Sequence, residues 1–74
     1  MNFPLSGEYI ELCKLLKAAN LAASGGEAKE MVAAGLVQVD GVPETRKRCK
    51  IRAGQQVEFQ GVRINVVDDS SAAR

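Results

Sequence analysis

Apolar residues recur with a helical period near the start of the chain. Between residues 8 and 20 they lie three or four positions apart, while charged residues occupy the other directions. This spacing predicts an amphipathic helix from Glu8 to about Asn20. The apolar side of that helix is expected to contain Tyr9, Leu12, Cys13, Leu16 and Ala19.

A second helix is predicted to begin at Ser24. In the order Ser24-Gly25-Gly26-Glu27 the serine hydroxyl can accept a hydrogen bond from the Glu27 amide, and the Glu27 carboxylate can reach back to Ser24, as in a capping box. Gly35 suits the left-handed position that ends a helix. The helix between them should bury Ala28, Met31 and Val32, with Leu36 as a further candidate.

From residue 37 the apolar positions alternate with polar ones, the pattern of half-buried strands. Val37 and Val39 precede an Asp40-Gly41 turn, and a later pair of strands, 56–59 and 62–66, is joined by Gln60-Gly61. The order of elements predicts an α+β fold. Two short N-terminal helices, arranged like a helix-turn-helix pair, should pack on a small, mostly antiparallel sheet of β-hairpins, leaving one sheet face free.

Length and composition indicate one small globular domain. The 74 residues suit a single domain over 1–74, with an ordered core at about 8–67 and a frayed tail at 68–74. No apolar run approaches the roughly 18 residues of a membrane span, and the first residues lack the order of a signal peptide. A cytoplasmic monomer without a membrane partner is therefore expected.

Positive charge is concentrated in one segment. The formal net charge is only +1, yet five of the ten Lys and Arg residues lie in a stretch without acidic residues: Arg46, Lys47, Arg48, Lys50 and Arg52. We call these five the basic cluster. In an extended chain Arg46, Arg48, Lys50 and Arg52 would share one side, with Cys49 and Ile51 on the other. Lys47 breaks this alternation, which predicts a loop over 44–47 before a strand.

The basic cluster predicts a site for an anionic polymer. Arginine predominates, and its planar guanidinium suits paired contacts to phosphate. The alternative is that the charges only protect an edge strand from aggregation. Of the three aromatic residues, Tyr9 and Phe59 are expected in the core, so no base-stacking platform is expected. Backbone and shape recognition of structured RNA is favoured, and an adaptor that docks an acidic protein on the same face is the alternative.

Other kinds of site are poorly supported. The chain has no histidine and only two cysteines, which excludes His-dependent nucleophilic catalysis and a zinc site of four Cys or His ligands. We expect no enzymatic activity, no metal, no cofactor and no small-molecule substrate. Cys13 and Cys49 should be free thiols that pack in the core.

Three runs, 24–29, 35–41 and 53–57, resemble the S4-type RNA-binding domain first described in a small-subunit ribosomal protein. The segment 44–51 is similar to the small stand-alone bacterial members, and the resemblance covers about Leu12 to Phe59. It implies an RNA surface built from the helix pair, the adjoining loop and the hairpin, with ribosomal or transfer RNA as possible targets. Many members carry a basic residue directly after the serine, where this chain has glycines, whose free amides could bind a phosphate. The basic cluster and the resemblance together give these candidate site residues: Ser24, Gly25, Lys29, Thr45, Arg46, Lys47, Arg48, Lys50 and Arg52.

Overall fold

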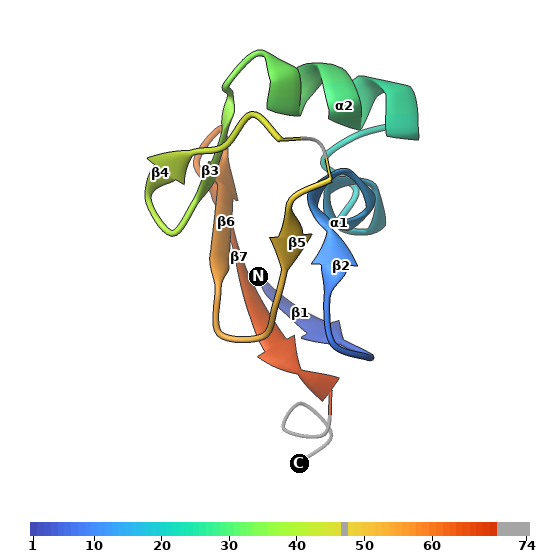
Figure 1. The fold of residues 1–74 in the computed structure, drawn as a ribbon, viewed down its shortest axis with the longest axis vertical. Coiled ribbons are helices and arrows are strands. Elements are labelled where there is room, and N and C mark those ends of the chain that lie inside the picture. The colour runs from blue at the N-terminus through green and yellow to red at the C-terminus, as the bar shows by residue number, and fades with distance from the viewer. Residues whose placement is uncertain (47, 70–74) are drawn as a thin grey trace.

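The structure, a computed structural model, describes residues 1–46 and 48–69. Within these residues the chain forms a five-stranded sheet, a two-stranded sheet and two short helices (Figure 1). The predicted α+β architecture is therefore confirmed. The larger sheet contains, in spatial order, β1 (Asn2–Leu5), β7 (Val62–Asp68), β6 (Gln56–Phe59), β3 (Val37–Val39) and β4 (Val42–Pro43). The smaller one pairs β2 (Ile10–Glu11) with β5 (Lys50–Ile51), and the helices are α1 (Leu12–Ala18) and α2 (Gly25–Ala33).

Strand β1 was not predicted, because the sequence pattern assigned no element before residue 8. It pairs in parallel with β7, with Phe3 opposite Val66, and Asn65 N donates to Met1 O at 2.7 Å. The other strand pairs that the structure describes are antiparallel. Four residues that include a proline give little alternation to detect, and proline is tolerated here because β1 is an edge strand.

Both predicted tight turns are present. Asp40 and Gly41 have φ values of 51° and 82°, and Gln60 and Gly61 have φ values of 50° and 80°. Two successive left-handed residues are the conformation of a type I′ turn, which matches the twist of the strands on either side. These turns join β3 to β4 and β6 to β7.

Helix α2 begins and ends as predicted. The Ser24 hydroxyl accepts a hydrogen bond from Glu27 N at 3.2 Å. Gly35, with φ of 75°, donates to Val32 O at 3.0 Å, and Leu36 N donates to Met31 O at 3.2 Å, which together form a Schellman motif. The chain turns away at this motif, so Leu36 is 55% exposed and its predicted burial is wrong.

Helix α1 is shorter than predicted. Ile10 and Glu11 are extended and pair with Ile51 and Lys50 in the two-stranded sheet. Leu12 N donates to Cys49 O at 2.9 Å, so the helix starts only at Leu12. Tyr9 precedes β2 and is 42% exposed, which contradicts its predicted place in the core.

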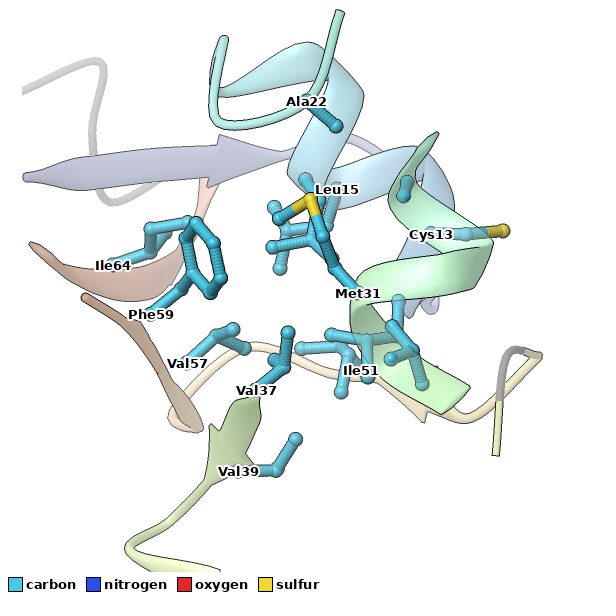
Figure 2. Packing of buried hydrophobic residues seen from close by; sticks show 14 of the residues in the cluster. Cys13, Leu15, Ala22, Met31, Val37, Val39, Ile51, Val57, Phe59 and Ile64 are labelled. Atoms are coloured by element: carbon cyan, nitrogen blue, oxygen red, sulfur yellow. The ribbon is translucent and has the colours of Figure 1, made fainter. Parts of the chain in front are cut away.

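The core lies between the helices and the inner face of the larger sheet (Figure 2). Side chains of β3, β6 and β7 meet those of α1 and α2 there, and Ile51 of β5 is fully buried among them. The opposite face is polar, with Glu58 and Arg63 forming an ion pair at 3.6 Å, in agreement with one free sheet face. Both cysteines are free thiols, Cys13 buried and Cys49 half-buried. The buried set is Leu5, Leu12, Cys13, Leu15, Leu16, Ala22, Ala28, Met31, Val32, Val37, Val39, Ile51, Val57, Phe59, Ile64 and Val66.

Candidate functional site

The segment between β4 and β5 carries most of the basic cluster. It leads from the larger sheet to the helix pair (Figure 1). Its first residue, Glu44, donates its backbone N–H to Val37 O at 3.0 Å, and near its end Cys49 O accepts from Leu12 N at 2.9 Å. The segment is thereby fixed at one end to β3 and at the other to the start of α1. Lys47 lies outside the described residues.

The strand predicted after Lys47 is shorter than expected, since β5 contains only Lys50 and Ile51. Arg48 instead lies in a turn, in which Cys49 N donates to Arg46 O at 3.1 Å. The predicted alternation still holds over the last three positions, where Ile51 is fully buried and Lys50 and Arg52 are exposed. The short pairing of β2 with β5 thus leaves the Lys50 and Arg52 side chains exposed to solvent.

Arg46 is neutralised by an acid that precedes the cluster. Its Nε and Nη2 lie 3.1 and 2.9 Å from the two carboxylate oxygens of Glu44, and its backbone N lies 3.0 Å from Glu44 Oε1. Hydrogen bonds from the Arg46 side chain and backbone lower the pKa of Glu44 to about 2, and the carboxylate in turn raises the pKa of Arg46. At neutral pH the pair therefore adds no net charge to the surface.

The remaining described cations of the cluster are less compensated. Arg48 is 85% exposed, and its Nε lies 4.0 Å from Glu11 Oε2, while the other oxygen of Glu11 lies 3.2 Å from Lys14 Nζ. An exposed pair at that separation contributes little. Within residues 1–46 and 48–69, neither Lys50 nor Arg52 has a carboxylate within 4.0 Å. Among the described residues of the basic cluster, the positive charge comes chiefly from Arg48, Lys50 and Arg52.

A chain of hydrogen bonds fixes the backbone of Arg52. Its backbone N donates to Gln55 Oε1 at 2.7 Å, and Gln55 Nε2 donates to Asp40 Oδ2 at 3.3 Å. Asp40 also accepts from Gln56 N at 3.0 Å. The turn after β5 is therefore tied to the turn between β3 and β4, and the exposed guanidinium projects from an ordered backbone.

An open hollow of about 440 Å³ lies beside the turn and is lined by Arg46, Arg48, Cys49 and Lys50. Cys49 was predicted to be a core residue, but it is half-buried and reaches this hollow. Burial, followed by the nearby Glu44 carboxylate, raises the pKa of its thiol, which stays protonated at neutral pH. The hollow is suited to an anion rather than to thiolate chemistry.

The predicted helix side of the surface lies at the start of α2 and on α2. Ser24 caps α2, Gly25 is its first residue and Lys29 is exposed on it. In the part of the chain that the structure describes, no hydrogen bond or ion pair joins these residues to the 44–52 segment. A Cβ at Gly25 would meet no atom within 4 Å, so packing does not require glycine there. Thr45 is exposed next to Arg46.

The structure adds an aromatic residue to the site that the sequence reasoning missed. The Nζ of Lys50 lies 4.9 Å from the centroid of the Tyr9 ring, a cation–π arrangement. The alternation of 9–11 could have been read as the partner strand of 50–52. Three residues, however, fit the first turn of a helix equally well, so only the pairing between β2 and β5 resolves the choice.

Among the described residues, no three His, Cys, Asp or Glu side chains gather closely enough to hold a metal ion. No helix in the same residues has the length and apolar character to cross a membrane.

Comparison with known proteins relates this chain to one family. The model of the S4 domain matches residues 3–67. The Escherichia coli K12 protein named "Putative RNA-binding protein YbcJ" is 54% identical over 59 residues, which cover 80% of this chain and 84% of that protein. A protein of Shigella flexneri named "Uncharacterized protein YbcJ" is similar to the same extent.

The fold agrees with this relationship. The solution structure of E. coli YbcJ, reported with an αL motif involved in RNA binding, matches with a TM-score of 0.70 and 51% identity, over 89% of this chain and 85% of that one. The two proteins thus share both sequence and architecture over most of their lengths. The chain belongs to the S4 domain family.

Proposed function

We propose that the protein binds structured RNA without catalysis, mainly through the phosphate backbone. The observation that carries the proposal is the group of exposed cations Arg48, Lys50 and Arg52, which lie in the β4–β5 turn, on β5 and directly after β5. Acidic residues in the described part of the chain compensate their charge only weakly. The names given to YbcJ and to its structure support it, because they concern RNA binding in a relative that is more than half identical.

Each part of the surface has a defined role in this proposal. Arg48, Lys50 and Arg52 contact phosphates, and Lys47 is a further phosphate contact of the basic cluster. Thr45 lies next to Arg46 in the chain, and Glu44 neutralises the charge of Arg46. Ser24, Gly25 and Lys29 form the flank on α2, where backbone amides at the helix start favour an anion. Ribosomal and transfer RNA are the target classes, and the protein acts as a cytoplasmic monomer.

Salt titration of RNA binding tests the proposal. On nucleic acid each phosphate contact contributes about 0.7 to 0.9 to the slope of log affinity against log salt. The variant Arg48→Ala/Arg52→Ala should lower that slope by about 1.4 to 1.8 on a transfer RNA and on a ribosomal RNA helix. The control Lys17→Ala/Arg63→Ala removes the same charge from exposed positions elsewhere, and should leave the slope nearly unchanged.

The same assay separates RNA binding from the adaptor alternative. An acidic polypeptide such as poly-glutamate is added as a competitor of the RNA. The proposal fails if structured RNA does not bind at low salt, if poly-glutamate binds more tightly than RNA, or if the control lowers affinity as much as the site variant does.

A further inference from the structure

We propose that Tyr9 is a stacking platform for an unpaired nucleobase of the bound RNA, an inference that rests on the proposed function and names a feature of its ligand. Tyr9 is 42% exposed, and a tyrosine ring offers an apolar face on which another ring can stack. Tyr9 directly precedes β2, so the pairing of Ile10 with Ile51 fixes the backbone beside it. An ordered, exposed ring is a surface on which a base can stack at small entropic cost.

The ring lies on the cationic side of the two-stranded sheet. Alternation places Tyr9 and Glu11 on one side of β2 and half-buried Ile10 on the other, and on β5 it separates buried Ile51 from Lys50 and Arg52. The contact of Lys50 with the Tyr9 ring, 4.9 Å from Nζ to the centroid, shows that the two outward sides coincide. Figure 1 shows β2 and β5 side by side.

This combination matches the chemistry of a single nucleotide. A base stacks on the part of the ring that Lys50 leaves open, and the Lys50 ammonium then lies within reach of the phosphate. Glu11 is the acid on this side, and it is already shared between Lys14 and Arg48. The ligand is therefore an unpaired base next to a duplex: the duplex backbone lies on the cations and the unpaired base on Tyr9. Base–aromatic stacking tolerates any base, so the selectivity is for unpaired structure rather than sequence.

The inference is tested with one RNA duplex in several forms. The forms are blunt, with an unpaired adenosine at the 3′ ends, at the 5′ ends or as a bulge, and with an abasic nucleotide at the preferred position. We expect the wild-type protein to bind one unpaired form on the order of tenfold more tightly than the blunt and abasic forms. Tyr9→Leu should lose that preference, and Tyr9→Phe should keep it. With 2-aminopurine at the unpaired position, stacking should quench fluorescence for the wild type and Tyr9→Phe only.

The outcomes distinguish the platform from RNA binding itself. Equal affinity for all forms, or an unchanged preference in Tyr9→Leu, overturns the platform while the effect of Arg48→Ala/Arg52→Ala still supports RNA binding. A wild-type protein that binds none of the duplexes, nor transfer or ribosomal RNA, at low salt overturns both. The melting temperature of each variant is compared with that of the wild type, and an unchanged value shows that the fold is intact.

Discussion

The pair Glu44–Arg46 offers a sharp test of which cations act on RNA. Two side-chain contacts of 3.1 and 2.9 Å hold the guanidinium on the carboxylate, and a pKa of about 2 keeps Glu44 ionised at neutral pH. If the pair acts as a neutral unit, Glu44→Gln adds one positive charge to the surface and Arg46→Ala adds one negative charge. The double variant restores neutrality.

The expected magnitudes follow from the charge change. One phosphate contact contributes about 0.7 to 0.9 to the salt slope, which is about threefold in affinity for a fourfold change in salt. Glu44→Gln should therefore steepen the slope by about that amount and bind more tightly, while Arg46→Ala should flatten it and bind more weakly. The double variant should bind about as well as the wild type.

Fluorescence anisotropy with a labelled transfer RNA, at several salt concentrations, measures the four proteins of this cycle. Thermal melting serves as the control, because Glu44 also accepts a hydrogen bond from the backbone N of Arg46 at 3.0 Å. A double variant that binds as weakly as Arg46→Ala refutes the reasoning, since Arg46 would then contact RNA itself despite its bond to Glu44.

Three further predictions concern stability and protonation. Ser24→Ala should lower the free energy of unfolding by about 1 kcal/mol through loss of the bond to Glu27 N; urea unfolding measures it, with exposed Ser6→Ala as control, and an unchanged midpoint contradicts the capping role. Ile51→Ala should cost about 2 to 5 kcal/mol because the side chain is fully buried; the 64% exposed Val42 serves as control through Val42→Ala, and a loss no larger than the control's contradicts its place in the core. The Glu44 carboxyl should titrate near pH 2 by NMR and at a higher pH in Arg46→Ala, which loses the side-chain hydrogen bonds and keeps the one from the backbone N–H. Because the folded-state pKa lies below the unfolded one, the stabilisation from ionised Glu44 is full above pH 4.5 and is lost as the pH falls towards 2, and a wild-type midpoint near 4.5 would contradict the pairing.

The elements that could be predicted depend on residues close together in the chain. The cap at Ser24 joins positions three apart, and the turn at Asp40-Gly41 requires two successive left-handed residues. The end of α2 at Gly35 likewise involves hydrogen bonds that span three to five residues. Such local signals are readable in a sequence because the interacting groups are neighbours whatever the rest of the chain does.

The basic cluster was also a local signal, but its electrostatics were not. Glu44 precedes it by two residues, and only the conformation of the loop brings its carboxylate onto Arg46. Glu11, which lies on β2, reaches Arg48 in the turn before β5. The basic cluster contains five cations in the sequence. In the described part of the structure, Arg48, Lys50 and Arg52 are the cations of the cluster whose charge is least compensated by acids.

By itself, the sequence determined the α+β class, the α2 boundaries, both tight turns and the position of the positive charge. Tertiary structure alone decided that β1 joins the sheet, that Ile10 and Glu11 pair with Ile51 and Lys50 rather than starting a helix, and that Tyr9 faces solvent beside Lys50. The physical reason is that these pairings join backbones about 40 to 60 residues apart, so no pattern within a short stretch of sequence reports them.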